Sequence, residues 1–235
     1  MRHGHKIGVV IPALNEVEAI GRVIGDIPAW VDTIVVADNG STDGTPEVAE
    51  SLGARVAIEP DGAYGAACLA GIKVLPECSI IAFVDGDYAD YPDRLDQIVD
   101  PVARDEADLV IGSRRLGRAG TGALTPQQRF GNWLACRLIR LFWGVAYTDL
   151  GPFRAVHSEA LRKLAMTDRA FGWTVEMQLR AIQEELRVRE VPVDYRARIG
   201  RSKISGTLRG TILAGHAILG TIFRTAMSGR LRKQD

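Results

Sequence analysis

The sequence predicts an α/β protein whose mostly parallel central sheet carries helices on both faces. Up to Gly112, short apolar runs of strand length alternate with helix-length segments, and the loops between them are short. The apolar runs are nearly continuous, which is typical of parallel strands buried on both faces. Polar clusters follow these strands, at the edge where open α/β sheets bind their ligands.

The first half of the chain is expected to alternate strictly between strands and helices. We expect strands at residues 7–12, 33–37, 55–58, 79–84 and 107–112, and helices at residues 16–27, 46–52, 62–74 and 92–104. Pro12 is expected to end the first strand, because proline cannot donate a hydrogen bond to a sheet ladder. The first helix is amphipathic, since Ile20, Val23, Ile24 and Ile27 share one face.

The pattern changes after Gly112, where residues 113–122 are rich in glycine and arginine. A helix over 126–145 combines aromatic residues with interspersed arginines. It is interpreted either as a core helix whose arginines extend to solvent or as a surface helix lying in a lipid interface. A turn at 147–154, a helix up to Glu184 and a strand over 186–193 follow.

A basic loop at 196–203 leads to the last helix, expected over 207–227 and followed by a basic tail. An interfacial membrane helix, a plain docking helix and an oligomer contact all fit this pattern. We therefore expect one catalytic domain over 1–205, with a C-terminal amphipathic helix and tail over 206–235. Whether the chain forms a homo-oligomer is left open.

Composition limits the classes of partner. The chain has 235 residues, of which 46% are hydrophobic and 25% charged, and this suits one large domain. Lys+Arg and Asp+Glu both number 29, so no overall field would attract nucleic acid. The three cysteines lack metal or redox spacing, as expected of a reducing compartment. No run reaches the roughly 18–20 apolar residues that span a bilayer. A cytoplasmic protein, with peripheral contact at the inner face of the cell membrane, is the expectation.

Three acids follow the strand expected at 79–84. Unpaired carboxylates are very costly inside a buried strand, so Asp85, Asp87 and Asp90 are expected at or beyond its carboxyl end. Gly86 would let the backbone bend between the first two acids. Clustered carboxylates suit Mg²⁺ or Mn²⁺, and substrate phosphates would complete the coordination of the ion. The alternative is a solvated acidic turn.

Several motifs in order resemble those of glycosyltransferase family 2. They are Val10-Ile11-Pro12-Ala13-Leu14-Asn15-Glu16, Asp38-Asn39-Gly40-Ser41-Thr42-Asp43-Gly44-Thr45, Asp85-Gly86-Asp87, Gly112-Ser113-Arg114 and Asp149-Leu150-Gly151-Pro152-Phe153-Arg154. The resemblance runs from about residue 6 to 205. It is greatest to the dolichol-phosphate mannosyltransferase-like branch, which includes bacterial polyprenyl-phosphate glycosyltransferases.

This resemblance implies a GT-A fold, a nucleotide-sugar donor, a divalent metal (Mg²⁺ or Mn²⁺) and inversion at the anomeric carbon. By position, the donor contacts would be Pro12, Leu14, Glu16, Asp38, Asn39, Gly65, Asp85, Gly86, Arg198 and Lys203. Asp87 and Asp85 would hold the metal. The catalytic residues would be Asp87, Arg114, Glu176 and Lys203. For Gly65, close approach of a phosphate or of another backbone, and tight helix–sheet packing, are all left open.

The implied chemistry agrees with these residue types. Negative charge develops on the departing nucleoside diphosphate, and a metal at Asp87 together with the Lys203 cation would stabilise it. The sequence departs from the branch at Ala89, where a glutamine is usual, and at Asn39, where a second acid is usual. The branch's arginine and serine contacts to the lipid phosphate have no clear match near Leu124 and Gln128.

Three functions are therefore weighed. The first is transfer of a hexose from a UDP- or GDP-sugar to a polyprenyl phosphate or another lipid, which needs no base because the phosphate is already anionic. The second is transfer to a soluble hydroxyl acceptor, which needs a base. Glu176 is the candidate base, unless it merely caps its helix. The third is a catalytically silent nucleotide-binding partner protein, against which the intact Asp85, Asp87, Asp149 and Lys203 argue.

Overall fold

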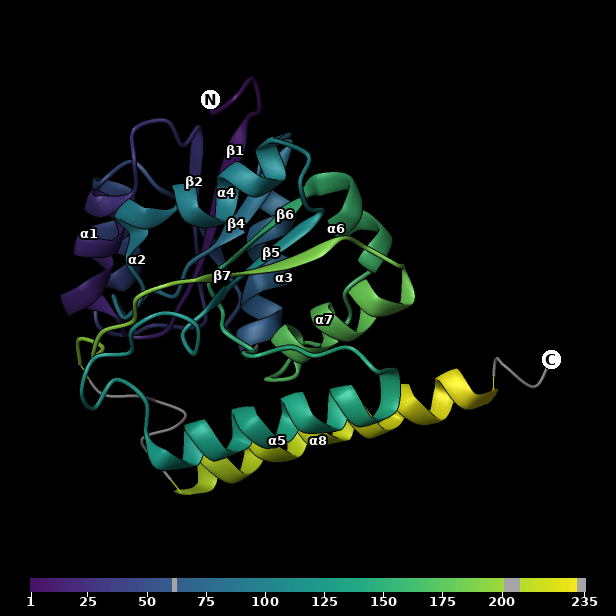
Figure 1. The fold of residues 1–235 in the computed structure, drawn as a ribbon. Helices are drawn as coiled ribbons and strands as arrows, with labels where there is room; N and C mark the ends of the chain where they lie inside the picture. The colour runs from purple at the N-terminus through teal and green to yellow at the C-terminus, as the bar shows by residue number, and fades with distance from the viewer. Residues whose placement is uncertain (61–62, 201–207, 232–235) are drawn as a thin grey trace.

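The computed structural model describes residues 1–60, 63–200 and 208–231 and shows a mixed seven-stranded sheet between layers of helices (Figure 1). The strands are β1 (Ile7–Ala13), β2 (Thr33–Asp38), β3 (Arg55–Ile58), β4 (Ile80–Phe83), β5 (Leu109–Ser113), β6 (Arg154–His157) and β7 (Val188–Pro192). Their order across the sheet is β3-β2-β1-β4-β6-β5-β7. The mostly parallel α/β architecture predicted from the sequence is thus confirmed.

Helices cover both faces of the sheet. They are α1 (Val17–Asp26), α2 (Thr45–Ser51), α3 (Tyr64–Val74), α4 (Asp96–Ala103), α5 (Pro126–Trp143), α6 (Ser158–Leu164), α7 (Trp173–Gln183) and α8 (Leu208–Leu231), with a 3₁₀ turn η1 (Pro92–Arg94). The apolar residues of α1, α2 and α4 form one core with one face of the sheet. Those of α3, α5, α6 and α7 form the core on the other face, joined by Ile222 of α8. Continuous apolar strands make both cores possible, because each strand buries side chains on both sides.

β6 was not predicted. It lies between β4 and β5 and runs antiparallel to both, with Ala82 opposite Ala155 and Val110 opposite the same residue. The sequence pattern missed it because the strand is only four residues long and its first residue, Arg154, was assigned to the Gly/Pro-containing turn expected at 147–154. β4 and β5, which follow one another in the chain, are therefore separated in the sheet by a strand from later in the chain.

Two expected element boundaries also change. β1 continues through Pro12 to Ala13 instead of ending at the proline. The neighbouring strand β4 ends at Phe83, before the point where it would face Pro12, so no strand there lacks a hydrogen-bond donor. The carbonyl of Pro12 accepts a hydrogen bond from Gly86 N in the loop after β4. The helix expected over 92–104 is divided into η1 and α4.

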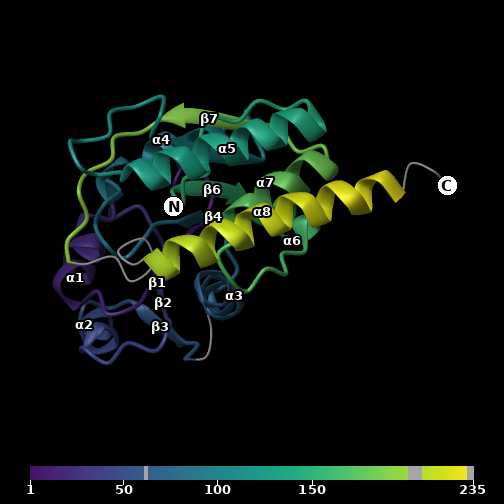
Figure 2. The same cartoon turned by 90° about the horizontal axis from the view of Figure 1, so that it is seen from below.

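α5 and α8 lie side by side along one end of the molecule (Figures 1 and 2). The rings of Phe142 and Phe223 meet edge to face, with centroids 5.8 Å apart. α5 begins with a capping box at Thr125 and ends at Gly144, which adopts a left-handed conformation. The capping box defines where α5 begins and Gly144 defines where it ends, so the local sequence sets the length of the helix.

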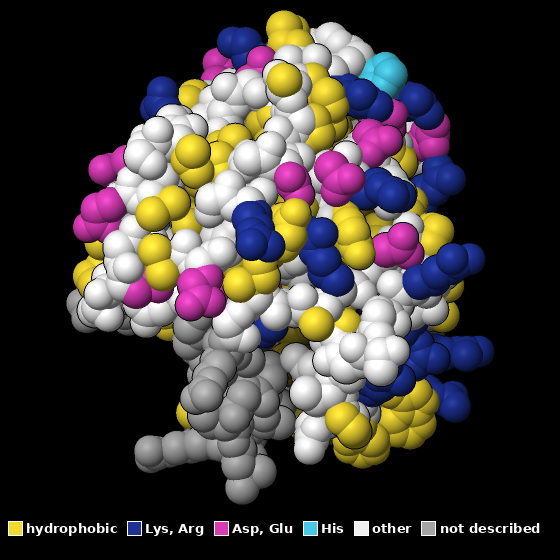
Figure 3. All heavy atoms as spheres, turned by 90° about the vertical axis from the view of Figure 1, so that its left-hand side faces the viewer, with side chains coloured by type: hydrophobic (Ala, Val, Ile, Leu, Met, Phe, Trp, Pro, Cys, Tyr) yellow, Lys and Arg dark blue, Asp and Glu magenta, His cyan; other side chains and the backbone are white. Residues whose placement is uncertain are grey.

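α5 is buried along one strip and exposed along another. One strip, made of Ala135, Cys136 and Ile139, is buried against the core, whereas the side chains of Phe130 and Trp133 are 60% and 43% exposed. In Figure 3, hydrophobic and basic side chains gather side by side on the lower part of the molecule, where α5 lies. Within the described residues, no helix has the length and apolarity needed to cross a membrane.

Candidate active site

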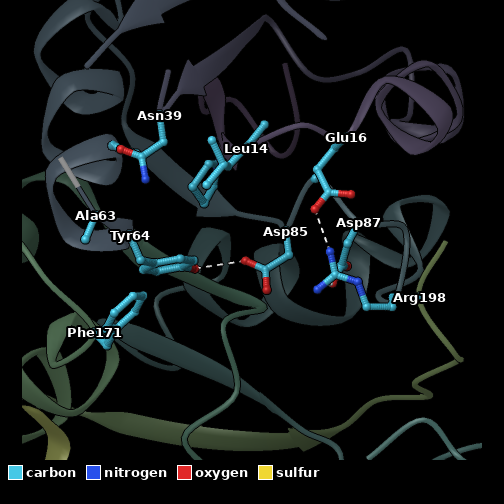
Figure 4. A pocket seen from close by; sticks show the side chains of 13 residues that line it. Leu14, Glu16, Asn39, Ala63, Tyr64, Asp85, Asp87, Phe171 and Arg198 are labelled. Carbon is cyan, nitrogen blue, oxygen red and sulfur yellow. Dashed lines mark hydrogen bonds and ion pairs between the residues drawn. The ribbon is translucent and has the colours of Figure 1, made fainter. Parts of the chain in front are cut away.

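The carboxyl ends of β1, β2 and β4 meet the N-terminus of α3 around a cavity of about 280 Å³ (Figure 4). This edge is where the sequence placed the ligand site, because parallel strands bring the residues that follow them together. Eight of the predicted site residues line the cavity. They are Pro12, Leu14, Glu16, Asn39, Asp85, Gly86, Asp87 and Arg198. We call this space the donor cavity.

The two predicted metal ligands face this cavity in a charged, mostly buried setting. Asp85 Oδ1 accepts a hydrogen bond from the Tyr64 hydroxyl at 3.0 Å, and Asp87 Oδ1 accepts one from Ala89 N at 3.0 Å. Burial, reinforced by the negative charge of Asp87, raises the pKa of Asp85 to about 7. Two carboxylates that raise each other's cost of ionisation favour the binding of a cation beside them.

Arg198 supplies one such cation. Its Nη2 lies 2.5 Å from Glu16 Oε1 and its Nη1 lies 3.3 Å from Asp87 Oδ2 (Figure 4). The preceding Arg196 places its guanidinium 3.4 Å from the centre of the Tyr88 ring. The part of the basic loop that the structure describes, up to Gly200, is therefore anchored across the mouth of the site. Lys203, predicted to contact the diphosphate, lies outside the described residues.

Asp38 and Asn39 lie at and just after the end of β2. Asp38 Oδ2 accepts hydrogen bonds from Gly40 N at 3.0 Å and Ser41 N at 2.9 Å, so this carboxylate shapes the loop that follows the strand. Among the described residues, the buried Oδ1 atoms of Asp38 and Asn39 have no hydrogen-bond partner. Asn39 lines the donor cavity, whereas Asp38 is buried and is not among its lining residues.

The acidic loop fits a divalent metal. Asp90, on the same loop as Asp85 and Asp87, is 1% exposed, and both its carboxylate oxygens lack hydrogen-bond partners in the described part of the chain. Burial and the charges of Asp85 and Asp87 raise the pKa of Asp90 well above its ordinary value. Over the described ranges, no three His, Cys, Asp or Glu side chains form a complete metal cage. Mg²⁺ usually takes one or two carboxylates and fills its other positions with water and substrate phosphate.

Arg114, a predicted catalytic residue, does not line the donor cavity. It forms a bidentate pair with Asp149, with Nε to Oδ2 at 2.8 Å and Nη2 to Oδ1 at 2.7 Å, and its guanidinium lies 5.1 Å from the centre of the Tyr195 ring. Burial alone would lower the pKa of Arg114, but the hydrogen bonds to Asp149 outweigh burial and raise it. The pair joins the end of β5 to the loop before β6.

Gly65 is positioned by packing against the protein itself. Its N–H donates to Ala170 O at 3.0 Å, and a Cβ at this position would lie 2.1 Å from Asp168 O. Real side chains cannot approach a backbone oxygen that closely, so the position requires glycine. These contacts are a close approach of another backbone, from the segment before α7, and not the helix–sheet packing weighed from the sequence.

Glu176, the candidate base, lies on α7 outside the donor cavity and lines a separate polar cavity of about 750 Å³. Its carboxylate accepts hydrogen bonds from Thr167 N, Thr167 Oγ1, Asp168 N and Arg180 Nε, at distances from 2.7 to 3.2 Å. A carboxylate engaged by this many donors is held in place, and it lines a different cavity from the acids after β4.

Sequence reasoning missed two aromatic residues of the donor cavity, Tyr64 and Phe171. Tyr64 stands inside the small-residue run that opens α3, and an aromatic residue among glycines and alanines was a usable signal. Phe171 comes from a loop more than eighty residues after the acidic motif, and no spacing rule connects the two.

Comparison with known proteins places this geometry in a family. The family model described as glycosyl transferase family 2 matches residues 8–165, most of the sheet and the whole acidic motif. The chain belongs to glycosyltransferase family 2. It is a glycosyltransferase, as the order of motifs predicted, and among the known members is a Mycobacterium tuberculosis protein named only as an uncharacterised glycosyltransferase. That protein is 36% identical over 221 residues, covering 90% of this chain and 95% of its own.

A second relative supports the dolichol-phosphate mannosyltransferase-like branch that the motifs resemble. The dolichyl-phosphate hexose transferase of Haloferax volcanii is 31% identical over 230 residues, which is 96% of each chain. Among solved structures, the glucosyl-3-phosphoglycerate synthase of Mycobacterium tuberculosis, in complex with Mn²⁺, UDP-glucose and phosphoglyceric acid, aligns with a TM-score of 0.77. It is 24% identical and the match covers 95% of this chain and 80% of that one. The GT-A fold expected from the sequence is thereby confirmed.

Proposed function

We propose that this glycosyltransferase moves a hexose, with inversion, from a UDP- or GDP-sugar to the phosphate of a polyprenyl phosphate at a membrane surface. The observation that carries the donor half is the cavity in which Asp85, Asp87 and Arg198 face one another beside Asn39 and Leu14. It provides carboxylates for a metal, a cation for phosphate and an apolar wall for the nucleoside. The solved synthase with Mn²⁺ and UDP-glucose supports the same kind of donor.

Each group of residues then has a defined task. Leu14 and Pro12 offer apolar contact, and the unpartnered Oδ1 of Asn39 accepts a hydrogen bond from the nucleoside. Asp87 and Asp85 hold Mg²⁺ or Mn²⁺, which when bound neutralises the charge on the departing diphosphate. Arg198, already between Glu16 and Asp87, adds a second positive charge at the same point. Lys203 is proposed to add a third.

The acceptor half rests on a different argument. A phosphate acceptor is already ionised, whereas a hydroxyl acceptor needs a base. The carboxylate proposed as that base, Glu176, is occupied by backbone and side-chain donors on another surface. This favours a phosphate acceptor. The relative named dolichyl-phosphate hexose transferase, matched over nearly its full length, supports a lipid-linked phosphate.

A soluble acceptor is the second candidate. The structural neighbour is crystallised with phosphoglyceric acid, a small phosphorylated molecule with a hydroxyl group. In the proposed scheme this would require a base supplied from outside the Glu176 cluster. The two candidates share a donor site and differ only in what attacks the sugar.

The test is a transfer assay with radiolabelled UDP- and GDP-hexoses. We expect label to move into the organic phase with polyprenyl phosphate as acceptor, only when Mn²⁺ or Mg²⁺ is present, and to be lost in Asp87→Asn. Asp93→Asn, an exposed acid of η1 outside the donor cavity, is the matched control. Transfer to phosphoglyceric acid with none to the lipid would select the second candidate. No transfer from any sugar nucleotide, with no nucleotide binding, would reject the proposal.

A further inference from the structure

Residues 167–172, between α6 and α7, form a wall shared by two cavities. Phe171 lines the donor cavity, whereas residues 167–170 line the polar cavity beside α7 and α8. Figure 4 shows Phe171 on the same side of the donor cavity as Tyr64 and Ala63. Whatever fixes this segment therefore also fixes one wall of the donor cavity.

Glu176 fixes one end of the segment. Its Oε2 accepts from Thr167 N at 3.1 Å and from Asp168 N at 2.8 Å, while its Oε1 accepts from Thr167 Oγ1 at 2.7 Å. Arg180, one turn along α7, completes the cluster with Nε 2.9 Å from Glu176 Oε1 and Nη2 2.9 Å from Thr167 Oγ1. Glu176 is 7% exposed, and hydrogen bonds to a buried charged group are the stronger kind.

The segment also contacts α3 and α8. Ala170 and Arg169 accept hydrogen bonds from Gly65 N and Ala66 N of α3. At Gly172, a Cβ would lie 2.2 Å from Asp168 Oδ2 and 2.6 Å from Thr221 Oγ1 of α8. The segment thus contacts α3 on one side and α8 on the other, and at Gly65 and Gly172 these contacts leave no room for a Cβ atom.

The contact with α3 extends the effect to the acidic loop. Tyr64, the first residue of α3, is followed directly by Gly65, and its hydroxyl holds Asp85. A shift of segment 167–172 would therefore move both Phe171 and the helix end that carries Tyr64. Both belong to the wall of the donor cavity.

We infer that Glu176 is a positioning residue, which shapes the nucleotide-sugar site by holding segment 167–172 and, through it, Phe171 and the N-terminus of α3. This rests on the proposed function of the donor cavity. It differs from the role of a base, because a base acts on the acceptor during transfer, whereas a positioning residue already affects binding of the nucleotide alone.

Nucleotide binding without any acceptor separates the two roles. Calorimetric titration with UDP and with GDP, each with Mn²⁺, should show about tenfold or more weaker binding in Glu176→Gln, because an amide cannot accept from all of the surrounding N–H donors. Glu184→Gln, an exposed carboxylate at the end of the same helix, should bind like the wild type. Unchanged nucleotide affinity in Glu176→Gln would overturn the inference.

A double-mutant cycle tests the route. If Glu176 acts through the segment, adding Phe171→Ala to Glu176→Gln should weaken binding by less than the product of the two separate factors. Losses that multiply in full would show that Glu176 does not act through segment 167–172.

A second variant covers the case in which Glu176→Gln does not fold. Thr167→Val removes one donor to the same carboxylate at an exposed residue and should weaken nucleotide binding two- to threefold, about 0.5 kcal/mol. Wild-type affinity in Thr167→Val would then count against the inference.

The outcomes also separate this inference from the proposed function. If the wild-type protein binds neither nucleotide, the donor cavity has been misassigned and the proposed function fails. If the wild type binds a nucleotide and Glu176→Gln binds it equally well, the donor site stands and only the positioning role is lost.

Discussion

The hydroxyl of Tyr64 donates a 3.0 Å hydrogen bond to Oδ1 of Asp85 across the donor cavity. This contact connects the N-terminus of α3 to the acidic loop after β4, two parts of the chain that carry different motifs. It also lowers the pKa of Asp85, against the larger effect of burial and of Asp87, both of which raise it. Tyr64 therefore favours the ionised form of a buried carboxylate at the proposed metal site.

We expect Tyr64→Phe to weaken Mn²⁺-dependent nucleotide binding about tenfold, because a hydrogen bond to a buried charged group contributes about 1.5–3 kcal/mol. Isothermal titration would measure this. Tyr147→Phe, a buried tyrosine outside the donor cavity, serves as the control. Equal affinities in the two variants would show that the Tyr64 hydroxyl has no part in the site.

Arg198→Met should destabilise the metal-free protein by about 2 kcal/mol, because it leaves the carboxylates of Glu16 and Asp87 without this cation. Mn²⁺ should then raise the melting temperature of the variant more than that of the wild type, since the ion supplies positive charge at the same place. Thermal melts with and without Mn²⁺ would measure both effects. Arg162→Met, whose side chain is 73% exposed, should behave like the wild type, and an equal Mn²⁺ shift in all three proteins would count against the argument.

Asp149→Asn should lower the free energy of unfolding by about 3 kcal/mol, because it leaves the Arg114 guanidinium buried beside a neutral amide. Urea denaturation would measure the loss. Asp93, which forms an exposed ion pair with Arg94, offers the control. Asp93→Asn should change the free energy of unfolding by less than about 0.5 kcal/mol. Similar small effects in both variants would mean that the Arg114–Asp149 pair is not a structural element.

The pair between Arg2 and Asp100 predicts a specific pH dependence. The hydrogen bond from Arg2 lowers the pKa of Asp100, so folding favours its ionised form. This contribution to stability is present above the ordinary pKa near 3.8 and disappears as the pH falls through the lowered value. Asp100→Asn should therefore be about 1 kcal/mol less stable than the wild type at pH 7, with a difference that shrinks below pH 4. A difference that stays constant down to pH 2.5 would contradict this assignment.

The exposed aromatic residues of α5 predict membrane association. Phe130→Ser with Trp133→Ser should reduce sedimentation with anionic vesicles at least tenfold, because each aromatic side chain contributes about 1.5–3 kcal/mol when it leaves water. Neutral vesicles should bind the wild type less well, since Arg129, Arg137 and Arg140 on the same helix are exposed. Leu52→Ser, an exposed apolar residue beside α2, is the control. Wild-type protein that never sediments would reject the membrane part of the proposal.

Much of the donor cavity could be predicted because its residues follow directly on strands that the sequence makes obvious. β1, β2 and β4 are apolar runs that end in polar motifs, and parallel pairing brings those ends to one edge. The strand pattern alone placed Asn39 and Asp87 at this edge, whereas Leu14 was predicted from the resemblance to glycosyltransferase family 2. The acidic loop could be located for the same reason, since a carboxylate cannot remain in the strand before it.

What the sequence determined by itself was therefore the alternation of strands and helices, the edge that carries the site and the acids that follow β4. Only the tertiary structure decided that β6 enters between β4 and β5, that Phe171 joins the cavity lined by the residues after β1, β2 and β4, and that Glu176 turns towards residues 167–168. The physical reason is the distance along the chain over which each kind of interaction acts. Strand periodicity and turn chemistry act between neighbours in the chain, whereas strand insertion and the direction of a buried carboxylate depend on donors and surfaces that only the folded chain brings within reach.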